Sequence, residues 1–173
     1  MNEDKFSVEV QDIGSPITIM AIHGGRIEPG TSNIAKAIAG KNFNYYCFNG
    51  EKLRNNWDLH ITSGLFDDQQ ALALASRSEL VITIHGCVGP GKVAFTGGNN
   101  DALRFKLEKE LNEKSVQSRL HPTFDGQGIE NICNKGISAL GGIQFELTGW
   151  LRCFSLFKRR RFINTVRQVL LSQ

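Results

Sequence analysis

The sequence predicts a single α/β domain over residues 1–173, with a mixed, mostly parallel sheet that is flanked by helices on both faces. Short apolar runs, continuous or rich in β-branched residues, alternate along the chain with segments of helical periodicity. Such runs are typical of strands that are buried on both faces. Their alternation with helices is typical of α/β sheets. A length of 173 residues also suits one domain with a full core.

Six apolar runs are expected to form strands, and they cover residues 17–22, 45–48, 59–62, 80–84, 93–95 and 143–145. Three of the runs lead directly into a residue that can bind a metal or exchange a proton, namely His23, His85 and Glu146. Sheets of this class bind their ligands at the carboxyl ends of the strands. We therefore expect these three side chains to lie at one edge of the sheet.

Four helices are expected between and after these strands. The expected N-terminal caps of the first three are Thr31 or Ser32, Asp67 or Asp68, and Asn99 or Asn100. The first of these helices is expected to end near Gly40. The fourth is expected to start near Leu156 and to be amphipathic.

The composition excludes several classes of protein. A chain with 40% hydrophobic and 21% charged residues and a formal net charge of +3 is not expected to be disordered or to bind nucleic acid over its whole surface. No apolar run approaches the ~18–20 residues that span a bilayer, and the acidic N-terminal residues do not resemble a secretory signal. We therefore expect a monomeric protein without a membrane partner, kept in the cytoplasm at least until lysis or non-classical release.

The segment from His23 to Glu28 has the residue types of a metal site. Gly24 and Gly25 allow the chain to turn sharply, so that the carboxylate can return to the imidazole. With His85, the set becomes two imidazoles and one carboxylate, which leaves a fourth position open as in catalytic zinc sites. Glu146 could then take a proton from water and pass it to a leaving amine.

Each of these residues also has a purely structural explanation. A histidine after a strand is most often a loop residue, and a glutamate there can simply be exposed to solvent. The spacing alone also leaves His60, His121 and Cys87 as alternative ligands. The metal site is therefore supported by the joint occurrence of the residues and not by any one of them.

Residues 22–32, Ile-His-Gly-Gly-Arg-Ile-Glu-Pro-Gly-Thr-Ser, resemble the motif of the phage and bacillar poly-γ-glutamate hydrolases. Residues 142–147, Gly-Ile-Gln-Phe-Glu-Leu, are similar to a second motif of that family, and shorter matches lie between the two. The resemblance runs from roughly residue 15 to the end of the chain. The family resembles the carboxypeptidase-A-type zinc peptidases, so the resemblance implies a carboxypeptidase-A-like core.

The resemblance also implies a function. It implies Zn2+ bound by His23, Glu28 and His85, and Glu146 as general base and acid, in cleavage of the γ-linked amide of poly-γ-glutamate. A phage or prophage enzyme that degrades a host capsule would fit this activity. Each unit of the polymer carries a free α-carboxylate, so cations are expected near the cleft. The candidates for this role are Arg152, Arg26 and Lys92.

Two other functions remain open from the sequence. The same zinc site could act on a small acyl-amino acid or a cell-wall peptide, so the expected partner is an anionic polymer or a small acidic substrate. Alternatively, the basic run 158–161 could bind nucleic acid in a non-enzymatic phage protein. A solvated helix face is the simpler explanation of that run, and poly-γ-glutamate is another polyanion that it could attract.

Overall fold

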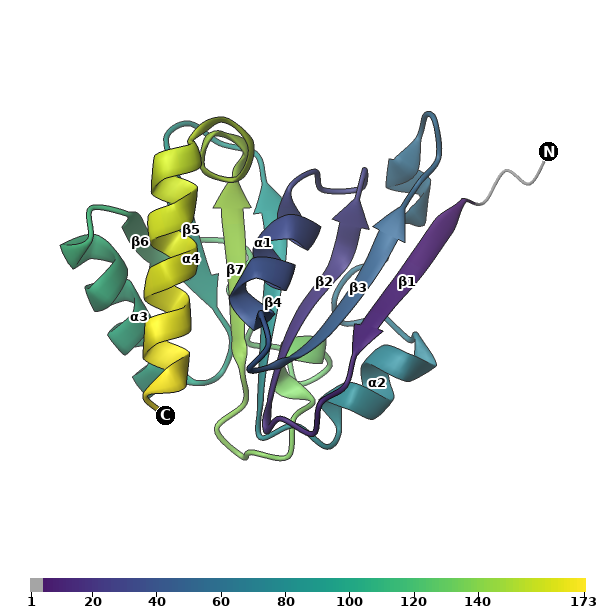
Figure 1. The fold of residues 1–173 in the computed structure, drawn as a ribbon, viewed down its shortest axis with the longest axis horizontal. Coiled ribbons are helices and arrows are strands. Elements are labelled where there is room, and N and C mark those ends of the chain that lie inside the picture. The colour runs from purple at the N-terminus through teal and green to yellow at the C-terminus, as the bar shows by residue number, and fades with distance from the viewer. Residues whose placement is uncertain (1–4) are drawn as a thin grey trace.

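The computed structural model describes residues 5–173 and is built around one seven-stranded sheet (Figure 1). In chain order the strands are β1 (Phe6–Gln11), β2 (Ile17–Gly25), β3 (Asn44–Gly50), β4 (Leu80–Cys87), β5 (Val93–Gly97), β6 (Gln117–Leu120) and β7 (Ile143–Thr148). Their spatial order is β1-β3-β2-β4-β7-β5-β6. The four central strands are parallel, whereas β1 and β5 run antiparallel to β3 and β7. The predicted mixed, mostly parallel sheet is therefore confirmed.

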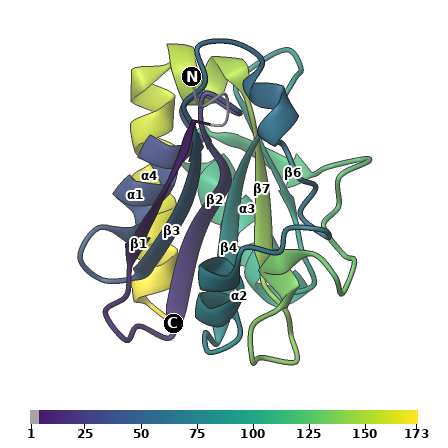
Figure 2. The same ribbon diagram turned by 90° about the vertical axis from the view of Figure 1, so that its right-hand side faces the viewer.

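Helices cover both faces of this sheet. They are α1 (Thr31–Ala39), α2 (Gln69–Ala75), α3 (Asp101–Glu113) and α4 (Leu156–Leu171), with the short turns η1 (Asn56–Leu59), η2 (Ile132–Asn134) and η3 (Trp150–Phe154). The apolar sides of α1, α3 and α4 share one core with the sheet, and α2 and η2 pack on the opposite face (Figure 2). Within residues 5–173, no helix is both long and apolar enough to cross a membrane.

Five of the six predicted strands are present, and the sixth prediction was wrong. Residues 59–62 form no strand, because Leu59 ends η1 and the chain continues as an irregular loop. The structure adds the edge strands β1 and β6, which were not predicted. Both are rich in polar residues, since an edge strand need not bury both faces.

The helix caps agree with the predictions at two of three positions. The Asp68 side chain accepts hydrogen bonds from the N–H groups of Gln70 and Ala71, and Asn100 accepts one from Leu103 N–H. At α1 the N-cap is instead Gly30, whose φ of 96° suits glycine. The Thr31 hydroxyl donates to the Glu28 carbonyl, and the Ser32 hydroxyl accepts a hydrogen bond from Gly25 N–H. Both hydroxyls therefore stabilise the turn before the helix.

A bulge in β2 decides which way His23 points. Ala21 pairs with Cys47 and Gly24 pairs with Asn49, so two residues of β2 oppose one residue of β3. Regular alternation would send His23 to the same face as Ala21, which packs in the core on the α1 side. The extra residue turns the imidazole toward the α2 side, where its Nδ1 lies 3.1 Å from that of His85.

Gly142, directly before β7, lies where no larger residue fits. A Cβ atom there would lie 2.1 Å from the carbonyl oxygen of Cys133 and 2.2 Å from that of Val81. Because both are backbone atoms, we expect Gly142→Ala to lower the free energy of unfolding by about 1–3 kcal/mol. Urea denaturation would measure this, with Gly128→Ala as the control, since nothing lies within 4 Å of its Cβ position. Equal midpoints for the two variants would contradict the close contact at Gly142.

Candidate metal and catalytic site

The candidate site lies at the carboxyl ends of three neighbouring parallel strands. A cleft of about 850 Å³ opens there, and its lining includes His23 from β2, His85 from β4 and Glu146 from β7. His85 and Glu146 are direct partners in the register of β4 and β7. The η1 turn, which carries Trp57, and Asn131 at the start of η2 form other parts of the wall. The expectation that the three side chains share one edge of the sheet agrees with this placement.

The turn after β2 returns Glu28 to His23. The Glu28 N–H donates to the His23 carbonyl at 3.0 Å, and the Thr31 hydroxyl donates to the Glu28 carbonyl at 2.8 Å. These bonds bring Glu28 Oε1 to 3.1 Å from His23 Nδ1. The other carboxylate oxygen accepts a hydrogen bond of 2.7 Å from Gly86 N–H. The carboxylate is therefore fixed between β2 and β4.

The side chains of His23, Glu28 and His85 meet in the cleft. Nδ1 of His23 lies 3.1 Å from both His85 Nδ1 and Glu28 Oε1, and His85 Nδ1 lies 3.9 Å from Glu28 Oε2. Tetrahedral zinc with ligands at ~2.0–2.2 Å needs roughly this separation between neighbouring ligand atoms. All three residues are at most 5% exposed. The geometry thus suits a buried metal site.

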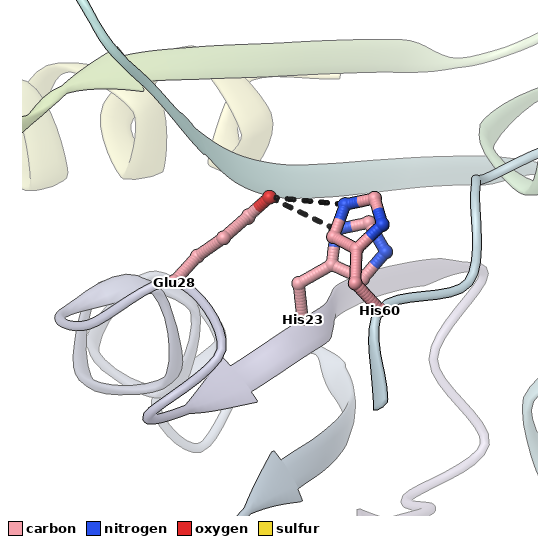
Figure 3. A group of neighbouring side chains, drawn as sticks. All are labelled: His23, Glu28 and His60. Carbon is pink, nitrogen blue, oxygen red and sulfur yellow. Dashed lines mark hydrogen bonds and ion pairs between the residues drawn. The ribbon is translucent and has the colours of Figure 1, made fainter. Parts of the chain in front are cut away.

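His60 lies beside the same carboxylate (Figure 3). Its Nε2 is 3.6 Å from Glu28 Oε1, and its ring stacks on His23 with centroids 3.8 Å apart. Trp57 stacks on His60 as well, at 4.2 Å. Ligand atoms of His23, Glu28 and His60 lie within 4.8 Å of one another. Two ligand sets therefore share His23 and Glu28 and differ in the second histidine.

The surroundings of His85 and Glu28 hold these two side chains in the protonation states that bind metal ions. Burial lowers the pKa of His85 to about 3, and the neighbouring His23 adds to the effect, so the imidazole is neutral at pH 7. Burial alone would raise the pKa of Glu28. Hydrogen bonds from His23 and His60 outweigh this and hold the pKa well below its usual range. A neutral imidazole and an ionised carboxylate are the forms that bind zinc.

Two amide side chains hold Glu146 in place. Gln144 Nε2 donates to Glu146 Oε1 at 3.3 Å, and Asn131 Nδ2 donates to Gln144 Oε1 at 2.7 Å, which fixes the orientation of the Gln144 amide. Burial and the charge of Glu28 raise the pKa of Glu146 to about 8, whereas Arg152 opposes this rise. Glu146 is therefore a carboxyl group that exchanges its proton near neutral pH.

In zinc-free protein, the raised pKa of Glu146 is expected to make folding stability fall as pH rises. The unfolded carboxyl titrates near 4.5 and the folded one near 8, so between these values the unfolded state loses its proton first. Urea denaturation in EDTA, at several pH values from 5 to 8, would give the free energy of unfolding of the wild type and of Glu146→Gln. The quantity of interest is the wild-type value minus the variant value. We expect this difference to fall by up to a few kcal/mol. A difference that does not change with pH would contradict the raised pKa.

Of the three predicted cations, the structure brings Arg152 to the cleft. Its Nη1 donates to the Pro29 carbonyl at 2.6 Å and its Nε donates to the Leu147 carbonyl at 3.2 Å. Arg26 instead bonds to the Lys52 carbonyl outside the cleft. Lys92 is exposed in the loop between β4 and β5 and also lies outside the lining. The placement of Arg26 and Lys92 therefore does not support their predicted role.

His121 and Cys87, the other two alternative metal ligands, are less suited to bind zinc than His60. His121 Nδ1 accepts the N–H groups of Thr123 and Phe124, which keeps it in its own loop and out of the cleft lining. Cys87 does line the cleft, but burial raises the pKa of its thiol to about 11. A protonated thiol is a poor zinc ligand.

Sequence reasoning gave no role to Trp57, Ser63 or Gln144. Gln144 could have been found, because a residue two positions before Glu146 on the same strand shares its face. Ser63 Oγ lies 3.4 Å from His85 Nε2, and Trp57 stacks on His60. Both come from the segment between β3 and α2, whose path depends on tertiary contacts.

Comparison with known proteins relates the whole chain to one family. A family model described as poly-gamma-glutamate hydrolase matches residues 1–169. UPF0714 protein YndL of Bacillus subtilis (strain 168) is 35% identical over 157 residues, which cover 87% of this chain and 61% of YndL. The SPbeta prophage-derived UPF0714 protein YoqZ of the same strain is 32% identical over 163 residues, which cover 92% of this chain and 56% of YoqZ. The chain spans about three fifths of the length of these relatives.

Solved structures agree with this relationship. The zinc-free apo form of YndL superposes with a TM-score of 0.90 at 29% identity, over 98% of this chain and 92% of the other. A bacteriophage poly-gamma-glutamate hydrolase gives a TM-score of 0.89 at 21% identity, over 99% and 90% of the two chains. An N-formylglutamate amidohydrolase from Ralstonia eutropha JMP134, with a TM-score of 0.64 at 10% identity over 98% of both chains, shares the fold alone. The predicted resemblance is confirmed, and the chain belongs to the poly-gamma-glutamate hydrolase family.

Proposed function

We propose that this protein is a zinc-dependent hydrolase that cleaves the γ-linked amide bonds of poly-γ-glutamate. One observation carries the proposal. Two buried imidazoles and a buried carboxylate converge within 3.1–3.9 Å, in a cleft that also holds Glu146. Membership of the family supports the substrate, and the zinc-free form of the relative YndL supports the choice of metal. The prophage origin of YoqZ supports a role in degrading a host capsule.

His23, Glu28 and His85 would hold the zinc ion. Bound there, zinc would polarise an amide carbonyl and lower the pKa of a water molecule. The 3.1 Å distance between His23 Nδ1 and His85 Nδ1 favours His85 over His60, because the two ring nitrogens are close enough to bind the same cation. The stacked ring of His60 would then pack behind His23 and orient it.

Glu146 would act first as general base and then as general acid. Gln144 donates to one carboxylate oxygen, so the other oxygen can accept a proton from the attacking water. The oxygen of that water forms a bond to the amide carbon, and the C–N bond breaks. Glu146 passes the same proton to the departing nitrogen, so the product leaves as a neutral amine.

Arg152 would bind a carboxylate of the substrate. Its Nη1 and Nε are held by the carbonyls of Pro29 and Leu147, which leaves Nη2 to donate to a ligand in the cleft. An arginine fixed in this way forms a directional, charge-assisted hydrogen bond. Such a contact would select a chain that has a free carboxylate on every unit.

An assay on the zinc-loaded protein tests this proposal. We expect it to shorten poly-γ-glutamate, to lose this activity when zinc is removed with EDTA, and to regain it when zinc is restored. Control substrates are α-linked polyglutamate, N-formylglutamate and a peptidoglycan stem peptide. If one of these controls is cleaved and the γ-linked polymer is not, the zinc site belongs to a different amidase. Protein that binds no zinc would contradict the metal site itself.

A further inference from the structure

The C-terminal segment holds the positive excess of the whole protein. From Leu147 to Gln173 the chain has six basic residues and no acidic one. The rest of the chain has more acidic than basic residues, although the net charge is +3. The charge is therefore strongly polarised along the sequence.

Four of these cations, residues 158–161, lie in the first two turns of α4, where helix stability does not explain them. Cations are unfavourable near the positive end of the helix dipole, and the first turn of α4 contains no acidic residue. Within residues 5–173, no carboxylate lies within 4.0 Å of a charged atom of Arg152 or of these four residues. The positive charge thus remains available to a partner.

Two of the cations share an exposed helix face with two large apolar side chains. The spacing of Leu156, Phe157, Arg160 and Arg161 places them on one side of α4, and all four are exposed. The Arg161 guanidinium lies over the Phe157 ring, 4.1 Å from its centroid. We call these four residues the α4 patch. Its surface offers both cations and apolar contact area.

One hydrogen bond links the start of α4 to the wall of the cleft. Arg159 Nη1 donates to the backbone carbonyl of Arg152 at 2.7 Å, and the Arg152 side chain lines the cleft. Figure 1 shows α4 beginning beside the η3 turn, at the end of the molecule toward which the β7 arrow points. Arg152 and Arg159 therefore connect the start of α4 with the cleft wall.

We infer that the α4 patch is a second binding site for poly-γ-glutamate, which holds a part of the chain outside the cleft. The inference rests on the proposed function. Each unit of the polymer has one carboxylate, which Arg160 or Arg161 can bind, and two methylenes, which can lie across Phe157 and Leu156. A chain that reaches both places gains from their linkage, because the second contact becomes intramolecular. The enzyme should therefore prefer long chains to short ones.

The test compares a long poly-γ-glutamate with a short γ-linked oligomer that fits the cleft alone. In the double variant Arg160→Gln/Arg161→Gln we expect kcat/KM to fall roughly tenfold for the long polymer and to stay unchanged for the oligomer. The matched control Lys106→Gln/Lys109→Gln removes the same charge from an exposed part of α3. We expect this control to behave as the wild type on both substrates.

An equal loss on both substrates, or a loss on neither, would overturn the inference. If the wild type cleaves neither substrate, the proposed function fails. A binding assay then tests the inference about the α4 patch independently of cleavage. For this the Glu146→Gln protein is mixed with the long polymer, duplex DNA or phosphatidylglycerol vesicles at one ionic strength. We expect polymer binding that is lost with Arg160→Gln/Arg161→Gln. Tighter binding to DNA or vesicles that is lost in the same way would assign the patch to that partner and overturn the inference.

Discussion

His85→Ala is expected to lose bound zinc, whereas His60→Ala is expected to keep it. His85 is almost fully buried, and its Nδ1 lies 3.1 Å from His23 Nδ1 and 3.9 Å from Glu28. Removal of a residue that only orients a ligand typically weakens metal binding by ~10–100-fold. Removal of a direct ligand should weaken zinc binding by more than this. His60 touches the same carboxylate but mainly stacks between two rings, so its loss should fall within that lower range.

Zinc content after dialysis and competition with a chelator would measure these affinities. His121→Ala is the matched control, because it removes an imidazole from a loop that lies outside the cleft lining. Zinc that stays in His85→Ala and leaves His60→Ala would assign the third ligand to His60. Zinc that stays in both variants would show that neither histidine completes the site.

Glu146→Gln is expected to keep zinc and the fold, whereas its kcat should fall by a factor of about 10²–10⁴. Glutamine has nearly the same shape, and its carbonyl oxygen can still accept the hydrogen bond from Gln144. It cannot take a proton from water, so only the proton transfer is removed. Zinc analysis, thermal melting and kcat on poly-γ-glutamate would together separate a catalytic loss from a structural one.

Glu130→Gln is the control for Glu146→Gln. Glu130 also lines the cleft, but its side chain is exposed and pairs with Lys135 at 3.2 Å. The substitution makes the same change from carboxyl to amide at the cleft and should leave kcat close to that of the wild type. Full activity in Glu146→Gln, or an equal loss in the two variants, would remove Glu146 from the proposed mechanism.

The parts of the fold that the sequence predicted are those with a strong local signal. The strands β2, β4 and β7 lie at the centre of the sheet and are buried on both faces, so their residues form continuous apolar runs. The edge strands β1 and β6 carry polar residues and give no such run. Residues 59–62 have an apolar alternation that is typical of a strand, yet tertiary contacts hold them as a loop against the site.

The candidate site shows the same division. His23, Glu28 and His85 could be proposed because two follow strongly apolar strand residues and the third follows a double glycine. The sequence named His60 among three alternative ligands and Arg152 among three candidate cations, but it could not place any of them relative to the cleft. Their positions depend on where loops and the η3 turn meet the sheet, and that is decided by packing between distant segments.

The bulge in β2 means that the metal centre depends on a count of residues as well as on their identities. A chain with one residue fewer between Ala21 and Gly24 could retain the sheet, the cleft and every ionisable group described above. The imidazole of His23 would nevertheless point to the α1 side of the sheet, away from the other ligands. Insertions and deletions are thus tolerated far less at this point than in the surrounding loops, and a chemically complete sequence can still encode an inert protein.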